Sequence, residues 1–120
     1  MSALEDKFHA EWKLHWPQLE LVREFSDVPM WEEDFQERYA KSKRSKRYRA
    51  DFALPASRSL IEIQGGTFNR GRHVTGSGYE RDARKFNLAM LCGWKVFLLT
   101  SQTAKEIAWL EKIAAVLRMP

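Results

Sequence analysis

The feature that most constrains the fold is residues 49–64, where two largely apolar stretches, each of which contains an acid, flank a short loop that contains proline. Because side chains in a strand alternate between faces, this pattern predicts a β-hairpin in which Leu54 pairs with Ser59. Asp51 then lies directly opposite Glu62 on one face of the hairpin. Two facing carboxylates repel each other and destabilise a sheet. The segment therefore predicts a positive group between the acids, most simply a divalent metal.

Oxygen ligands of this kind suit Mg²⁺, with Mn²⁺ as a substitute, rather than Zn²⁺. Asp51 and Glu62 are the candidate metal ligands, with the backbone carbonyl of Ile63 as a third. Gln64 lies on the same face, where it can orient water or phosphate but cannot act as a general base. The alternative is that both acids face solvent on an exposed hairpin. Isoleucine flanks Glu62 on both sides, and an idle charge in such surroundings is costly.

Basic residues are concentrated just before the hairpin. The chain has 20 Lys and Arg against 16 Asp and Glu, a net charge of +4. A basic run at 41–49 suits a phosphate backbone, and the alternative is a solvated arm or helix end. The candidate nucleic-acid contacts are Lys43, Arg44, Lys46, Arg47, Arg49 and, in a second segment, Arg70, Arg72 and His73. That second segment, 65–78, contains five glycines and reads as a mobile basic loop. His73 has two open roles, contact with phosphate and proton transfer near neutral pH.

The spacing of apolar residues predicts the other elements. Helices are expected at about 2–16, 30–42, 79–92 and from 103 onward, and strands at about 19–25 and 94–100. Capping boxes begin at Ser2 and Thr103, and Gly93 marks a helix end.

Apolar spacing also predicts which side chains are buried. The residues expected to face the core include Tyr79, Ala83, Phe86, Met90, Ile107, Leu110, Ala114 and Leu117. The nearly continuous apolar run at 94–100 is typical of a strand covered on both faces.

These elements predict one α/β domain over residues 1–120, a central mixed β-sheet flanked by helices, with a helical insertion at about 26–46 that is a second candidate for DNA contacts. The single cysteine, Cys92, excludes an intrachain disulfide and a Cys-based zinc cluster. Neither a signal peptide nor an apolar run of ~20 residues is visible. We therefore expect a soluble cytoplasmic protein with no membrane association.

Asp51, a ten-residue gap and Glu62-Ile-Gln64 resemble the PD-(D/E)xK nuclease superfamily, with glutamine where lysine is usual. The resemblance extends through the glycines and basic residues of 65–78, then Asp82, Lys85 and Gly93-Trp94, and covers roughly residues 47–100. This wider pattern is similar to small, mostly phage-borne endonuclease-like proteins related to the very-short-patch-repair and Holliday-junction-resolving branches. It implies a restriction-endonuclease-like core, Mg²⁺ dependence, DNA cleavage, often a homodimer and, for a phage-encoded protein, the host cytoplasm.

The absent lysine leaves two interpretations, a site that tolerates Gln64 or a lysine supplied from elsewhere. Lys85 is the candidate for a supplied lysine, and its alternative role is a surface ion pair with Asp82. The resemblance also implies a glutamate on the first helix near the metal. Glu5 is preferred to Glu11 because it lies next to the helix face that must meet the sheet.

The sequence therefore predicts a hydrolase, a metal-dependent DNA endonuclease in which water attacks the phosphodiester in line, with branched or junction DNA among the candidate substrates. One rival is a DNA-binding module that has kept a nuclease fold without turnover. Another is a subunit or inhibitor that uses the basic run against an acidic protein.

Overall fold

The computed structural model describes residues 2–43, 45–64 and 77–119. The helices are α1 (Ala3–His15), α2 (Trp31–Arg38), α3 (Ser77–Leu91) and α4 (Ile107–Leu117), with the short 3₁₀ helices η1 (Pro55–Ser57) and η3 (Thr103–Lys105). The strands are β1 (Val22–Phe25), β2 (Ala50–Leu54), β3 (Ser59–Gln64) and β4 (Lys95–Thr100). Within these residues, no helix combines the length and the apolar character needed to cross a bilayer.

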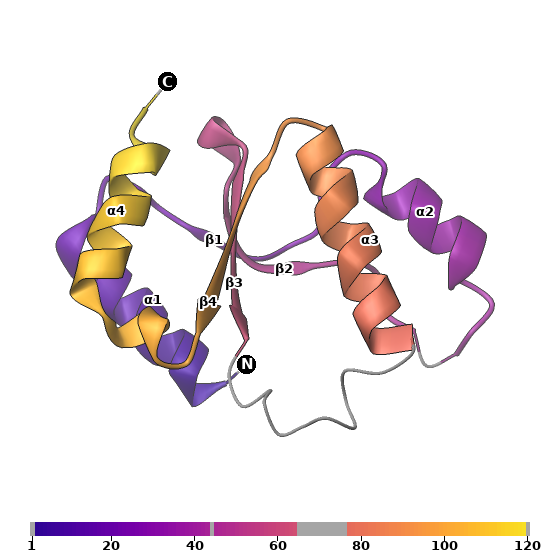
Figure 1. Ribbon diagram of the computed structural model, residues 1–120, viewed down its shortest axis with the longest axis horizontal. Helices are drawn as coiled ribbons and strands as arrows, with labels where there is room; N and C mark the ends of the chain where they lie inside the picture. Colours follow the sequence, from indigo (N-terminus) through magenta and orange to yellow (C-terminus); the bar gives the residue numbers. More distant parts are fainter. Residues whose placement is uncertain (1, 44, 65–76, 120) are drawn as a thin grey trace.

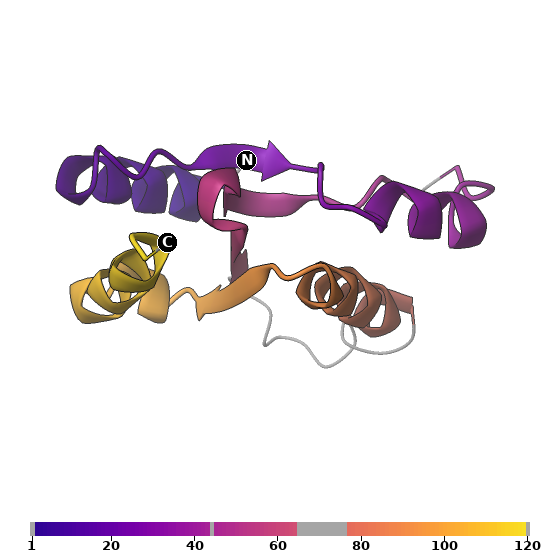
Figure 2. The same cartoon turned by 90° about the horizontal axis from the view of Figure 1, so that it is seen from above.

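The four strands form one mixed sheet in the order β1-β2-β3-β4. β2 is antiparallel to both β1 and β3, whereas β4 runs parallel to β3. Since parallel neighbours require a crossover, the connection that contains α3 carries the chain from β3 to β4. Helices α1 and α4 cover one face of the sheet, and α2 and α3 lie on the other (Figures 1 and 2). The predicted α/β class, a mixed sheet flanked by helices, is confirmed.

The hairpin of β2 and β3 has the predicted register, with Leu54 paired to Ser59 and Phe52 paired to Ile61. Phe52 and Ile61 belong to the buried cluster beneath α1 and α4. Ala53 belongs to the second cluster, which packs against α2 and α3. Asp51 and Ala53 are two residues apart in β2, so their side chains leave the strand on the same face of the sheet, the one that packs against α2 and α3.

Helix ends match the sequence prediction in two places and differ in two. The Ser2 hydroxyl accepts the N–H of Glu5 at 3.1 Å, as a capping residue should, and Gly93 ends α3 with a φ of +85°. However, α2 ends at Arg38, four residues early. At Thr103 only the short 3₁₀ helix η3 begins, and the predicted final α-helix, α4, starts at Ile107 instead. The Thr103 hydroxyl accepts the N–H of Thr100 at 2.8 Å and closes the turn after β4.

The burial predicted for α3 and β4 needs correction. Tyr79 and Met90 are 69% and 51% exposed, whereas Lys85, Phe86 and Ala89 are buried. The buried face of α3 is therefore rotated towards Lys85, which no apolar pattern would indicate. Strand β4 lies at the edge of the sheet, so it is not covered throughout as predicted, and its Leu98 is 52% exposed. For α4, Leu110, Ala114 and Leu117 are buried as predicted, but Ile107 is 36% exposed.

Candidate active site

Asp51 and Glu62 meet where β2 and β3 stop pairing through their backbones. Beyond the pair formed by Phe52 and Ile61, side chains take over the hydrogen bonds. The N–H of Asp51 donates to Oε1 of Glu62 at 3.0 Å, and the N–H of Ile63 donates to Oδ2 of Asp51 at 2.8 Å. The two predicted acids therefore lie together, and each carboxylate bridges the gap between the strands.

A lysine from α3 joins this cluster. Nζ of Lys85 lies 2.9 Å from Oε2 of Glu62 and 2.9 Å from the carbonyl oxygen of Arg49. The side chains of Lys85 and Glu62 are only 10% and 11% exposed. The alternative that Lys85 pairs with Asp82 on the surface is therefore wrong. The positive group next to the facing acids is this ammonium group.

Burial dominates the electrostatics of Glu62. It raises the pKa of this carboxyl above its ordinary value, the nearby charge of Asp51 raises it further, and Lys85 opposes the shift. The pKa of Glu5, in the first turn of α1, is also raised, mainly by burial and then by Asp51. Glu5 is thus within electrostatic reach of the site, whereas Glu11 pairs with His15 at 3.0 Å.

The raised pKa of Glu62 predicts how stability depends on pH. A carboxyl with a higher pKa in the folded state contributes stability below its unfolded pKa, and this contribution is lost as the pH rises through the folded pKa. Between pH 4 and pH 7, the free energy of unfolding of the parent protein should therefore fall relative to that of Glu62→Gln. Urea denaturation at a series of pH values measures the difference. If the free energy of unfolding depends on pH in the same way in the two proteins, the pKa of Glu62 is not raised in the folded state.

The backbone of Ile63 and the side chain of Gln64 lie beside the acids. In a strand, the N–H and C=O of one residue point the same way, so the carbonyl of Ile63 faces β2 together with its N–H. Gln64 is the last residue of β3, pairs with Thr100 of β4, and has the same parity as Glu62. Both therefore remain candidate contributors to the site.

In the basic run at 41–49, the arginines that the structure describes form ion pairs with glutamates. Nε of Arg47 lies 2.8 Å from Glu32, and Nη1 of Arg49 lies 2.9 Å from Glu24. Lys43 and Lys46 are exposed, and neither side chain forms an ion pair with any other described residue. The remaining candidate contacts, Arg44, Arg70, Arg72 and His73, lie outside the described residues.

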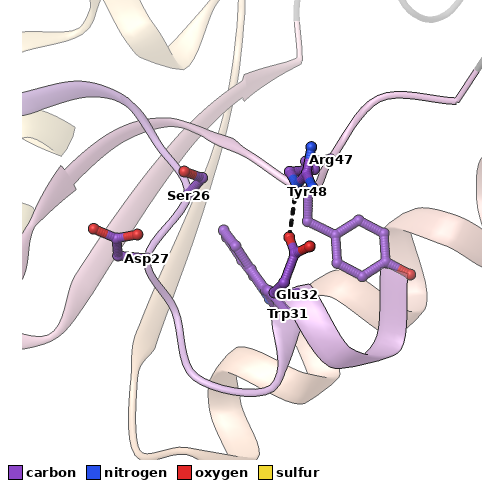
Figure 3. Close-up of a pocket in the computed structure, with 6 residues that line it drawn as sticks. All are labelled: Ser26, Asp27, Trp31, Glu32, Arg47 and Tyr48. Carbon is purple, nitrogen blue, oxygen red and sulfur yellow. Dashed lines mark hydrogen bonds and ion pairs between the residues drawn. The ribbon is translucent and has the colours of Figure 1, made fainter. Parts of the chain in front are cut away.

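A pocket of about 310 Å³ lies next to the start of α2 (Figure 3). It is lined by Ser26, Asp27, Trp31, Glu32, Arg47 and Tyr48. Glu32 and Arg47 are joined by their ion pair, which leaves Asp27 as the additional charge. An anionic lining does not suit a phosphate group, and none of these residues belongs to the cluster of Asp51, Glu62 and Lys85.

The donor atoms of the cluster fit a small hard cation. Among the residues that the structure describes, no group of three or more His, Cys, Asp or Glu side chains is placed to hold a metal. Mg²⁺, however, is commonly bound by one or two carboxylates and completes its shell with water and substrate oxygens. Asp51, Glu62 and the Ile63 carbonyl supply such a set.

Comparisons of the chain with family models, curated proteins and solved structures find no match.

Proposed function

We propose that the protein is a Mg²⁺-dependent endonuclease that hydrolyses phosphodiester bonds in DNA. The observation that carries the proposal is the convergence of Asp51 and Glu62 from neighbouring strands, with the ammonium group of Lys85 2.9 Å from Glu62. The mixed sheet with helices on both faces supports a restriction-endonuclease-like core, which the resemblance to the PD-(D/E)xK superfamily implies. That resemblance also motivates the proposals of a homodimer and of a cytoplasmic location.

Asp51, Glu62 and the Ile63 carbonyl would hold the cation, which when bound supplies an activated water and neutralises charge on the phosphate. Asp51 suits this role because no hydrogen bond among the described residues involves its Oδ1. Gln64 would orient the attacking water or the phosphate. Glu5 would contribute a further negative charge at the edge of the site.

Lys85 takes the place of the lysine that is absent at position 64. Its Nζ is fixed by two acceptors, Glu62 and the carbonyl of Arg49, so it needs no reorganisation to act. A preorganised ammonium group next to the cation ligands stabilises the negative charge that develops on the phosphate in the transition state. Gln64 carries no charge, so it cannot supply this electrostatic stabilisation.

One observation favours the rival function, a DNA-binding module without turnover. Both oxygens of Glu62 are already bonded, one to the N–H of Asp51 and one to Lys85, so a cation must compete for this carboxylate. Calorimetric titration with Mg²⁺, in the presence and absence of DNA, separates the two functions. The nuclease should bind Mg²⁺ more tightly with DNA present, whereas the module should bind DNA equally well with or without metal.

The proposed activity is tested on linear, nicked and branched DNA with Mg²⁺, Mn²⁺ or EDTA. We expect cleavage products with either metal and none with EDTA. The absence of products from all three DNA forms with both metals would contradict the proposal. Sedimentation of the protein alone and with four-way junction DNA tests the proposed homodimer.

Neutralising Glu32 should strengthen DNA binding, because Glu32 pairs with Arg47 in the proposed phosphate-binding run. Because an ion pair between exposed side chains is weak, Glu32→Gln should lower the Kd only a few-fold. It should also steepen the salt dependence by roughly one released counterion. Fluorescence anisotropy with a labelled duplex measures both quantities.

The matched control is Glu33→Gln, which changes the net charge equally at an exposed neighbour on the same helix. Long-range charge alone would affect the two variants alike. Equal affinities for Glu32→Gln and Glu33→Gln would therefore argue against Arg47 as a phosphate contact.

A further inference from the structure

Trp31, the first residue of α2, contacts α3 at the residue that carries the buried ammonium group. Its Nε1 donates to the carbonyl oxygen of Lys85 at 2.9 Å, and the residue is 1% exposed. A buried indole N–H requires a partner, so this bond fixes the ring relative to α3. The backbone of Lys85 is thus held from α2, while its side chain is held by Glu62 and by the Arg49 carbonyl.

A second contact from α2 reaches the neighbouring position of α3. Oδ1 of Asp34 lies 3.7 Å from Nη1 of Arg84, and Oδ2 of the same carboxylate accepts the Tyr48 hydroxyl at 2.7 Å. The Tyr48 ring in turn meets Trp31 edge-on, with 6.2 Å between ring centroids. Helix α2 therefore holds α3 at two successive residues through one connected set of side chains.

The outward side of α2 does not suit the DNA contacts that the sequence suggested for this insertion. Glu33 and Glu37 are exposed there, and neither forms an ion pair with another described residue. Like charges would repel a phosphate backbone from this surface. The helix must therefore serve mainly through its inward side, where Trp31 lies.

We infer that α2 is a positioning element for Lys85 and that Trp31 is the residue through which it acts. Local sequence spacing does not indicate this contact, because the partner of Trp31 lies 54 positions away. Any consequence for catalysis rests on the proposed function, whereas the placement of Lys85 can be measured without cleavage. Trp31 is a positioning residue, since it acts only through Lys85.

The test compares Trp31→Phe with Trp12→Phe. Trp12 is a matched control because it is also fully buried and also donates its indole N–H to a backbone carbonyl, that of Leu19, at 2.8 Å. It belongs to the other core cluster, beneath α1 and α4. The primary readout is the rate of reductive methylation of Lys85, measured by peptide mass spectrometry relative to the exposed Lys13. Urea denaturation of each variant corrects for global unfolding.

Trp31→Phe should increase the methylation rate of Lys85 by about three- to tenfold, the population shift equivalent to one buried hydrogen bond. Trp12→Phe should leave it unchanged after correction. In the cleavage assay, Trp31→Phe should lower kcat while KM stays constant. Equal methylation of Lys85 in the two variants would overturn the inference.

A second pair of variants keeps the test decisive if Trp31→Phe does not fold. Asp34→Asn weakens the other contact between α2 and α3, and Glu33→Gln is its control, with the same change of net charge. Lys85 should be methylated faster in the first variant only. If methylation behaves as expected but the parent protein cuts no DNA, the positioning role stands and the proposed function fails.

Discussion

Asp51→Asn should reduce Mg²⁺-dependent DNA cleavage by about a thousandfold, because it removes one of two negative charges available to a cation. This factor corresponds to roughly 4 kcal/mol of transition-state stabilisation, within the range for metal-ion catalysis. The fold should persist, because asparagine keeps an oxygen that can accept the N–H of Ile63. Initial rates on a labelled duplex, together with a thermal melt of each protein, measure the two properties separately.

The control for this experiment is Asp27→Asn, the same chemical change at an exposed acid that lines the pocket beside α2. This variant should cut at the rate of the parent protein. If Asp51→Asn also keeps the parental rate, then Asp51 holds no catalytic cation and the assignment of the site is wrong.

Lys85→Met should destabilise the protein by about 3–5 kcal/mol at pH 7, because it leaves Glu62 charged and buried without its cation. The two side chains are about one-tenth exposed, so solvent screens the pair only weakly. The loss should shrink as the pH falls, since burial and Asp51 have already raised the pKa of Glu62 and protonation removes the unpaired charge. Urea denaturation at pH 7 and pH 4.5 measures both effects.

The double variant Lys85→Met with Glu62→Gln should regain most of the lost stability. Glutamine is uncharged and still offers an oxygen to the N–H of Asp51. Lys105→Met, at an exposed lysine, should change stability by no more than about 0.5 kcal/mol. If Lys85→Met alone is as stable as the parent protein, the ion pair between Lys85 and Glu62 does not contribute to stability.

The hairpin was predictable because local patterns determine it. Side chains alternate between faces along a strand, which places Phe52 and Leu54 on one face and Asp51 on the other. The short loop sets the register, so the meeting of Asp51 and Glu62 followed from sequence alone. Glu5 could be preferred to Glu11 for a similar reason, its position beside the apolar side of the first helix.

Tertiary contacts decide between the two roles that the sequence left open for Lys85. A buried lysine looks like a surface lysine until its partner is known, and the partner of Lys85 lies 23 positions earlier on β3. Lys85 lies on the buried side of α3, whereas Tyr79 lies in solvent although its spacing is that of a core residue. Thr103 illustrates a local competition, because its hydroxyl accepts the N–H of Thr100 at the end of β4 instead of capping the final α-helix.

Where β2 and β3 diverge, the last cross-links of the hairpin are carboxylate oxygens rather than carbonyls. Architecture and the proposed chemistry thus depend on the same two carboxylates. A truncating replacement such as Asp51→Ala would leave an amide unpaired and loosen the end of the sheet, so lost activity in that variant would have two explanations. Amide replacements keep a bridging oxygen and are the substitutions that separate the two causes.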